Sequence, residues 1–283
     1  MKRINLLTVL GLLVWSGGVT RSAAAEPDKP AAPLFPDKHL ETAVRKFVFE
    51  KSDNDKPLVE ADVGNLSTIQ GVGLGITNLA GLEKCPALAS LDLAKNQITD
   101  LGPLKGLARL QYLNLADNQI SDVTPLGTIP ALQYVELSRN KVKNLQPLGA
   151  LTNLASLYLS QNQVADLSPV LSHPKLATLY ADGNQLKTIQ GINALRSLTS
   201  LNLNRNALTD LAPLTGLNNL YFLSLEHNKI RDLKPLLEMA KQDKEQRWAP
   251  FINIYLAGNP LGSAAKGSQI PGLKQIGARI FNN

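Results

Sequence analysis

The chain has 283 residues, of which 44% are hydrophobic and 18% are charged, and its formal net charge at pH 7 is +6. Three basic residues fall in an N-terminal segment with the pattern of a cleaved signal, and the remaining 26 basic and 23 acidic residues leave a net charge of +3. This is too little basic charge for a nucleic-acid binder. Cys85 is the only cysteine, so an internal disulfide is excluded.

Residues 1–25 have the pattern of a secretory signal peptide. A basic start at Lys2 and Arg3 precedes a short apolar run over 4–15, and the alanines at 23–25 fit an A-x-A cleavage site. No stretch approaches the roughly 20 consecutive apolar residues of a transmembrane helix. The sequence therefore predicts export to the periplasm or the extracellular space and no membrane span.

The segment after this signal predicts a linker followed by a small helical domain. Residues 26–36 are rich in proline and charge, which is typical of an extended linker that buries nothing. Residues 37–65 predict a helical N-terminal cap, with Asp37 as an N-cap, apolar residues at three- and four-residue spacing, and Arg45 on the outer face. A second short helix is expected near 59–66.

From residue 66 to 261 the chain repeats a pattern of 22 residues, LxxLxLxxNxI, whose first copy is degenerate because Leu74 replaces the asparagine. Its central alternation predicts a short strand with leucines inward, so that stacked copies form a curved parallel sheet. Eight such strands would form a concave face roughly 35 Å long. Recurrent prolines favour turns and short 3₁₀ segments on the convex face rather than long helices.

One asparagine of each copy is predicted to pair the backbone groups that turn inward where the strand ends, because its amide can both donate and accept. Its loss would leave buried groups unpaired, at about 1–3 kcal/mol each. This structural asparagine ladder consists of Asn96, Asn118, Asn140, Asn162, Asn184, Asn206, Asn228 and Asn259.

The period breaks once, by an insertion at about 237–250 that predicts a charged surface helix on the convex side. Phe251 is then expected to resume the motif in an inward position. Residues 262–283 predict a C-terminal cap, in which a helix begins at Pro271 and the final strand covers 278–281.

The extended pattern LxxLxLxxNxIxDLxPLxxL resembles the 22-residue bacterial leucine-rich repeats of internalins, and FPDKHLETAVRKFVFEK followed by EADVGNLSTI is similar to their helical N-terminal cap. The resemblance implies an α/β repeat fold, a leucine-rich-repeat solenoid. In internalins the concave sheet face holds a host-cell protein, which implies that the same face is the binding surface here.

The outward strand positions on the concave face carry five of the six tyrosines. Tyrosine is enriched in binding hot spots, although aromatic residues also favour strands without any binding role. Acidic residues at 92, 136, 182 and 226 suggest a partner with basic character, unless they are ordinary solvated surface charges. The candidate partner-binding residues are Tyr112, Tyr134, Glu136, Tyr158, Tyr180, Asp182, Phe222 and Tyr255.

Two reactive residue types fall in a column that the repeat places inside. Cys85 occupies a leucine position one copy before Leu107, which favours a buried, inert thiol. His173 occupies the same column three copies after Leu107. It could mark a seam that sets curvature, or simple drift of the repeat.

No serine, cysteine or carboxylate pair has a partner at catalytic spacing, and the three histidines are scattered at positions 39, 173 and 227. His227 beside an acidic residue is a possible pH-sensitive contact, and more simply a surface residue. Asp53 and Asp55 lack the downstream glutamate of a calcium loop, which favours a solvated turn. The sequence therefore predicts no enzyme, no metal site and no cofactor.

These features predict an exported, non-catalytic module that binds a protein partner through its concave face. Aromatic rings beside polar side chains also suit an envelope or extracellular glycan, and a purely structural or assembly role remains the third alternative. The partner's identity and the oligomeric state do not follow from the sequence.

Overall fold

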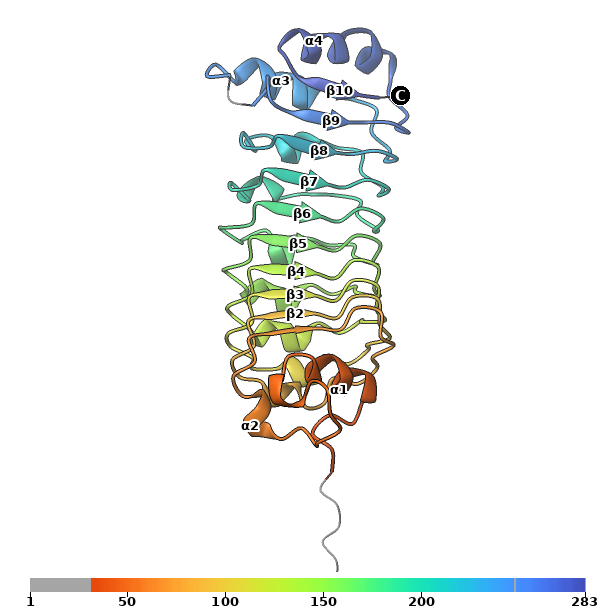
Figure 1. Ribbon diagram of the computed structural model, residues 1–283. Helices are drawn as coiled ribbons and strands as arrows, with labels where there is room; N and C mark the ends of the chain where they lie inside the picture. The colour runs from red at the N-terminus through yellow and green to blue at the C-terminus, as the bar shows by residue number, and fades with distance from the viewer. Residues whose placement is uncertain (1–31, 247, 283) are drawn as a thin grey trace, which may run out of the picture. The chain divides into compact units, whose positions relative to one another are not determined.

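The computed structural model describes residues 32–246 and 248–282, so the predicted signal peptide and most of the predicted linker lie outside the described residues. The described strands form one parallel sheet in chain order, β1 to β10 (Figure 1). This confirms the predicted solenoid. The strands are β1 Thr68–Gln70, β2 Ser90–Asp92, β3 Tyr112–Asn114, β4 Tyr134–Glu136, β5 Ser156–Tyr158, β6 Thr178–Tyr180, β7 Ser200–Asn202, β8 Phe222–Ser224, β9 Asn253–Tyr255 and β10 Arg279–Phe281.

The sheet has ten strands where the repeat count predicts eight, because the degenerate first copy supplies β1 and the C-terminal cap supplies β10. Register follows the 22-residue period: Leu91 lies opposite Leu113, which lies opposite Val135. These central residues are fully buried and their neighbours in each strand point outward. Leucines one period apart therefore stack into one continuous core along the solenoid.

The convex side consists mostly of short 3₁₀ segments, as predicted. Where a proline is present it occupies the first or second position, where its missing N–H costs no hydrogen bond. The two copies without proline begin instead after a glycine with positive φ, Gly81 or Gly191. The segments are Leu82–Lys84, Gly102–Leu104, Thr124–Thr128, Gln146–Ala150, Ser168–Val170, Ile192–Ala194 and Ala212–Leu214.

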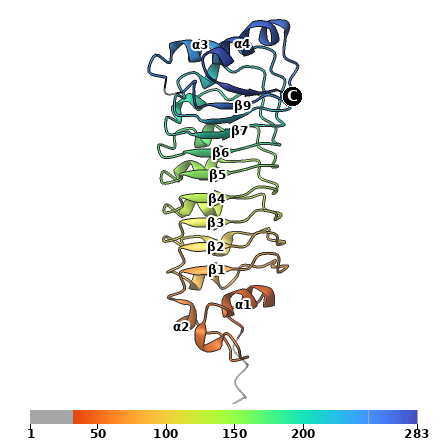
Figure 2. The ribbon, with the colours of Figure 1, turned by 45° about the horizontal axis from the view of Figure 1, so that its top comes forward.

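The N-terminal cap contains helices α1 (Lys38–Arg45) and α2 (Glu60–Val63), which cover the end of the sheet next to β1 (Figure 2). Asp37 joins this cap to the first repeat. Its Oδ1 accepts hydrogen bonds from the backbone of α1, and its Oδ2 accepts from the amides of Thr77 at 2.8 Å and Asn78 at 3.0 Å. Partial burial raises the pKa of Asp37, but these hydrogen bonds outweigh it and hold the pKa at about 2.

Arg45 does not lie on the outer face of α1 as predicted. Its guanidinium is half-buried, and Nη1 donates to the carbonyl oxygens of Lys51, Asn54 and Lys56 at 3.2, 2.9 and 2.9 Å, while Nη2 contacts Glu41 at 2.6 Å. The planar guanidinium has enough donors to hold the whole loop between α1 and α2. The amphipathic pattern missed this because the loop carbonyls leave no signal in the sequence.

The prediction that residues 26–36 bury nothing is wrong at the end of that segment. Phe35 is only 1% exposed, and Leu34 packs against the core. A side chain on Gly81 would place its Cβ 2.4 Å from the Leu34 carbonyl oxygen, so this close approach requires glycine, whose φ here is +104°.

The insertion forms helix α3 (Lys234–Gln242) beside the convex 3₁₀ segment that precedes β8, on the predicted side. It contributes more to the core than a charged surface helix would, because Met239 and Trp248 are buried. Phe251 does not resume the inward pattern as predicted. It is 63% exposed, and Ile252 is buried in its place.

The C-terminal cap contains α4 (Ile270–Gln275), which packs against β10. Helical conformation begins before the predicted start at Pro271, because a π-helical turn over Ala265–Gln269 leads directly into α4. The final strand β10 follows Gly277, whose φ of +110° ends the helix.

Candidate functional site on the concave face

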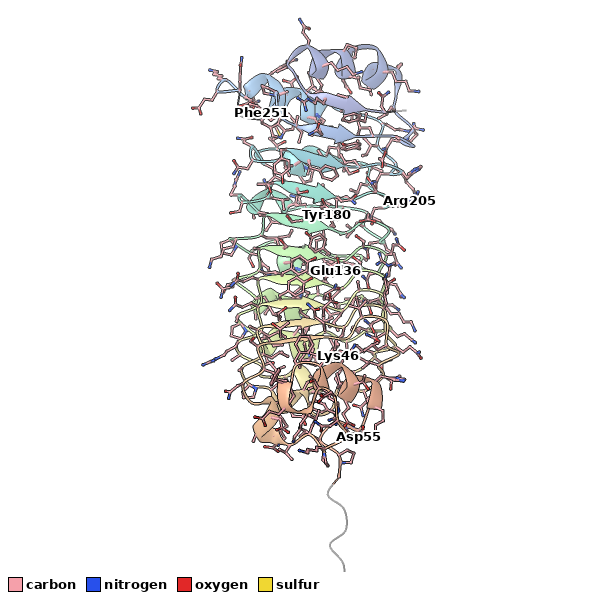
Figure 3. All side chains as sticks on the ribbon, in the orientation of Figure 1. Lys46, Asp55, Glu136, Tyr180, Arg205 and Phe251 are labelled. Atoms are coloured by element: carbon pink, nitrogen blue, oxygen red, sulfur yellow. The ribbon has the colours of Figure 1, made fainter. Side chains whose placement is uncertain are left out.

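Seven aromatic side chains form one uninterrupted row along the outward face of the sheet, from β3 to β10. Each ring contacts the next, so that the row spans eight strands. Figure 3 labels Tyr180 over the sheet, in the middle of this row. We name as the aromatic stripe Tyr112, Tyr134, Tyr158, Tyr180, Phe222, Tyr255 and Phe281.

The spacing of the rings follows the spacing of the strands. Adjacent centroids lie 4.6 Å apart for Tyr112 and Tyr134, and 5.2 Å apart for Tyr134 and Tyr158. Both values are close to the roughly 4.8 Å between neighbouring strands. Stacked, tilted and edge-on pairs all occur, and such contacts stabilise by about 0.5–1.5 kcal/mol beyond area burial. The stripe is therefore a preorganised surface rather than a set of separate mobile side chains.

The stripe crosses β7 although that strand carries no aromatic residue. Tyr180 on β6 and Phe222 on β8 lean toward each other until their centroids are 6.1 Å apart, closer than two strand spacings would place them. Ser200 of β7 is buried, and its hydroxyl lies 3.1 Å from the Tyr180 hydroxyl. A small residue at position 200 thus leaves room for the stripe to continue.

The interior rings of the stripe are half-buried because they cover each other. The planes of Tyr112 and Tyr134 are inclined by only 14°, so these two rings cover one another's faces. Burial, supported by neighbouring ionisable groups, raises the pKa of Tyr112, Tyr134 and Tyr158. These phenols therefore stay protonated at neutral pH.

Four carboxylates lie on the side where the strands end, Asp92 and Glu136 at the last position of β2 and β4 and Asp182 and Glu226 two residues beyond β6 and β8. They therefore occupy two neighbouring columns. Glu136 lies two residues after Tyr134, and Asp182 lies two residues after Tyr180. Local hydrogen bonds hold them in place: one Glu136 oxygen accepts from the Ser138 amide at 2.7 Å, and one Asp182 oxygen accepts from Ser160 and from Asn202. Among the described residues none of the four forms an ion pair, but the guanidinium of Arg139 interacts electrostatically with Glu136 and Asp182.

The eight predicted asparagines form a ladder beside the strand ends. In Asn140, for example, Oδ1 accepts from the Ile120 amide of the previous copy at 2.9 Å, and Nδ2 donates to the carbonyl oxygens of Leu115 and Leu137 at 2.9 and 3.0 Å. Every later copy repeats this arrangement, through to Asn259. Each asparagine thus pairs backbone groups of two consecutive copies.

The other singled-out residues lie away from the stripe. Cys85 is buried, and burial raises the pKa of its thiol to about 12, so it is not an activated nucleophile. His173 is 1% exposed, with Nε2 3.1 Å from the Leu148 carbonyl oxygen and no hydrogen-bond partner for Nδ1 among the described residues. His227 is exposed on the flank, with a positive φ of 54°.

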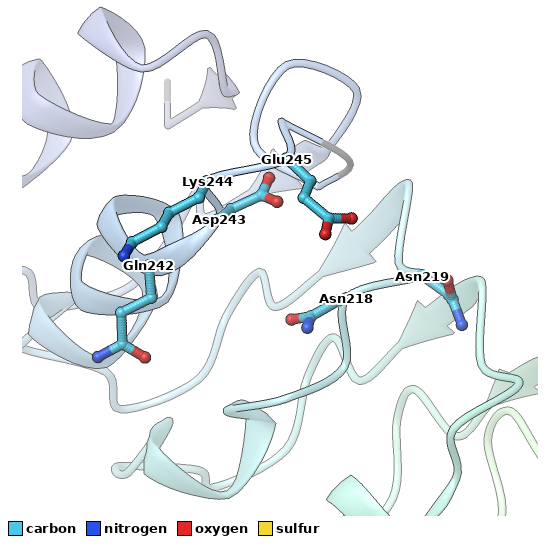
Figure 4. A pocket seen from close by; sticks show the side chains of 6 residues that line it. All are labelled: Asn218, Asn219, Gln242, Asp243, Lys244 and Glu245. Carbon is cyan, nitrogen blue, oxygen red and sulfur yellow. The ribbon is translucent and has the colours of Figure 1, made fainter.

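Sites for metals or small molecules are sparse in the described part of the chain. Asp53 is exposed in its turn, and within residues 32–246 and 248–282 no group of three or more potential ligands gathers around a metal position. A polar hollow of about 410 Å³ lies between α3 and the loop before β8 (Figure 4). Its lining is Asn218, Asn219, Gln242, Asp243, Lys244 and Glu245, and it carries no aromatic surface.

All eight predicted partner-binding residues lie on the concave face or at its edge, and the structure brings the six aromatic ones together. Phe281 completes the stripe, stacking on Tyr255 with centroids 4.6 Å apart, and the sequence prediction of binding residues missed it. The sequence did contain a signal, because the predicted final strand over 278–281 includes Phe281. In the structure β10 pairs with β9 in a register that sets Phe281 opposite Tyr255.

Comparison with known proteins identifies the family. A model of tandem leucine-rich repeats matches residues 86–128, 108–150, 130–173, 174–215 and 196–238, more than half of the chain. The crystal structure of internalin C2 from Listeria monocytogenes is 32% identical and aligns with a TM-score of 0.70, over 73% of this chain and 91% of that one. The chain belongs to the internalin-like leucine-rich-repeat proteins.

Two further structures share the fold. An internalin, InlF, from Listeria monocytogenes is 25% identical over 89% of this chain and 92% of that one, with a TM-score of 0.54. A leucine-rich-repeat protein of Leptospira interrogans, 24% identical with a TM-score of 0.62 over 72% of this chain and 57% of that one, shares the fold. None of the curated protein sequences gives a significant match. No helix in the described residues has the length and apolarity needed to cross a membrane.

Proposed function

We propose that this internalin-like chain is an exported, non-catalytic module that recognises a protein through its aromatic stripe. The observation that carries the proposal is the continuity of seven contacting rings on an outward face. Internal packing does not require these rings, since the leucine columns already fill the core. Repeat solenoids commonly use such extended concave surfaces for binding.

The packing of the rings favours a protein over a glycan. A sugar stacks on an exposed ring face, whereas Tyr112 and Tyr134 cover one another's faces, as do Tyr255 and Phe281, whose planes are inclined by 11°. With these faces covered, the stripe presents mainly an apolar aromatic surface, which suits the apolar side chains of a polypeptide.

Site-specific crosslinking tests this function. A photoreactive amino acid at position 158, introduced on living cells, should capture a protein that can be identified and purified. Its Kd for the Tyr134→Ala, Tyr158→Ala double variant should rise at least tenfold, while Phe251→Ala, which removes an exposed aromatic residue away from the stripe, leaves the Kd unchanged. Unchanged affinity of a folded double variant would refute the proposal.

Two further measurements address the alternatives. If the wild-type protein binds saccharides on a glycan array and the double variant does not, the stripe is a glycan-binding surface instead. Self-association that survives substitutions in the stripe would support a structural role instead.

Export is part of the same proposal and is tested separately. Cleavage after residue 25 predicts a mature chain that begins at Glu26, which the intact mass of protein recovered outside the cytoplasm would reveal. The division of the chain into signal, linker, caps and repeats likewise stays a prediction.

A further inference from the structure

The loops that follow the strands form one flank of the solenoid, on which Figure 3 labels Arg205. We call flank triplet the first, third and fourth residues after each ladder asparagine. After Asn140 this triplet consists of Lys141, Lys143 and Asn144, and all three side chains are exposed. It therefore carries two positive charges and no negative charge.

The other flank triplets between β2 and β8 lack this combination. One of them also has two basic residues, Lys229 and Arg231, but its fourth position is acidic. Another has the neutral Thr188 at that position but only one basic residue, Lys187. The remaining triplets have no basic residue. The aspartates at the fourth position are Asp100, Asp122, Asp166, Asp210 and Asp232.

Asn144 keeps the structural role of the aspartate that it replaces. Each of the five aspartates accepts a hydrogen bond from the amide two residues later, at 2.8–2.9 Å. Asn144 Oδ1 likewise accepts from the Gln146 amide at 2.9 Å. The turn therefore keeps its usual hydrogen bond without the negative charge. Asn144 Nδ2 donates no hydrogen bond within the described residues.

A hollow of about 330 Å³ lies at this triplet. Neither of its lysines forms an ion pair among the described residues, and Lys141 Nζ contacts only the uncharged Gln119 Oε1 at 3.4 Å. The hollow thus offers two ammonium groups and several neutral donors, and no carboxylate. Its lining is Ser121, Lys141, Lys143, Asn144 and Gln163.

Other charged residues of the same flank lie outside this lining. Arg139 is paired with Asp117. Asp122 and Asp166 occupy the position of Asn144 in the preceding and the following copy. Hydrogen bonds within their own turns lower the pKa of both carboxyl groups, so both stay ionised at neutral pH. They weaken the attraction of the hollow for an anion, and removing one of them should strengthen it.

We propose that this hollow binds the phosphate monoester group of a sugar, as a second site that does not depend on the aromatic stripe. A phosphate monoester carries about −1.5 to −2 charge at neutral pH and three acceptor oxygens, which suits two ammonium groups and neighbouring amide donors. Lysine is a common phosphate ligand and acts as a point charge. A carboxylate offers one charge and two oxygens, and therefore uses the site less completely.

The remaining volume and lining favour a sugar as the carrier of the phosphate. About 330 Å³ lies at the lower end of the range for ligand pockets, so the hollow accommodates more than the phosphate group alone. Ser121 and Gln163 supply a hydroxyl and an amide beside the lysines. Such groups both donate and accept, as sugar hydroxyls do.

NMR titration of the ¹⁵N-labelled full chain at constant ionic strength tests the site. Inorganic phosphate should shift the side-chain amide signals of Asn144 and Gln163, and should bind about tenfold more tightly than acetate. Lys141→Gln, Lys143→Gln should weaken phosphate binding at least about tenfold. The matched control, Lys229→Gln, Arg231→Gln, removes the same charge from the same positions four copies later. It should change the affinity by less than about twofold, because salt screens charges at that distance.

A substitution that the repeat already tolerates separates the site from the fold. Asn144→Asp keeps the acceptor for the Gln146 amide, as in five other copies, but places a negative charge in the hollow. It should weaken phosphate binding about tenfold. Asp122→Asn removes a neighbouring negative charge and should tighten the binding about twofold.

Glucose 6-phosphate should bind more tightly than inorganic phosphate and than O-phosphoserine. Tighter binding of O-phosphoserine would overturn the assignment to a sugar. Equal affinity for phosphate and acetate, equal losses in the two double variants, or no effect of Asn144→Asp would overturn the site itself. The stripe variant Tyr134→Ala, Tyr158→Ala should bind phosphate like the wild type, so this inference and the proposed function stand or fall separately.

Discussion

The asparagine ladder and the aromatic stripe run along the same sheet, but they follow opposite rules. From Asn118 to Asn259 each ladder residue accepts a hydrogen bond from the preceding copy at 2.9–3.1 Å. The stripe changes ring type, strand position and inclination from one strand to the next, from 11° to 78°. The asparagine ladder is thus nearly identical in every copy, whereas the aromatic stripe differs from copy to copy.

The difference has a physical cause. Every buried position must fit the copy before it and the copy after it, so a change in one copy is penalised by two neighbours. An outward side chain meets water on one side and is free to vary. The outward residues of the stripe nevertheless stay in contact across eight strands, which the proposed binding function would explain.

The largest expected loss of stability comes from a substitution in the asparagine ladder. Asn140→Ala should lower the free energy of unfolding by about 3 kcal/mol or more, because a buried amide and several carbonyls of two copies lose their partner at about 1–3 kcal/mol each. Asn144→Ala, four residues later, removes only the exposed bond to the Gln146 amide and should cost about 1 kcal/mol. Urea-induced unfolding followed by circular dichroism measures both, and equal losses would contradict the distinction between ladder and surface.

A smaller effect concerns the one histidine in the buried columns. Burial lowers the pKa of His173, against a weaker opposing effect of the Leu148 carbonyl. The unfolded chain therefore takes up a proton near pH 6.5 before the folded chain does, so the free energy of unfolding falls as pH drops below that value.

His173→Leu should remove this dependence and gain about 1 kcal/mol relative to wild type between pH 7 and pH 5. A His173→Leu variant with an unchanged slope would show that the buried imidazole does not titrate during unfolding.

The leucine columns and the asparagine ladder could be predicted from the sequence, and the aromatic stripe only in part. A period of 22 residues places every leucine and asparagine, because a stack allows one solution for all copies. The prediction was wrong for Phe251, because the turn that follows Trp248 places Ile252 in the buried position instead. Arg45 and Phe35 were misjudged because their partners are backbone atoms and a glycine surface, which leave no pattern of side chains. For the stripe, the sequence placed the tyrosines on one face, but the contact of Tyr180 with Phe222 across β7 depends on side-chain inclination.

The smallest expected loss of stability comes from the stripe itself, and it is the sharpest test of the contrast. Leu157 and Tyr158 are neighbours on β5, one fully buried and one outward. Leu157→Ala should cost about 2–5 kcal/mol, as large-to-small core substitutions do. Tyr158→Ala loses two ring contacts, each with centroids 5.2 Å apart, and should cost about 1 kcal/mol, because a half-exposed ring gains only about 0.5 kcal/mol from each contact, the low end of the usual range. A loss for Tyr158→Ala as large as that for Leu157→Ala would make the stripe part of the core, and its tyrosines would then need no partner to explain them.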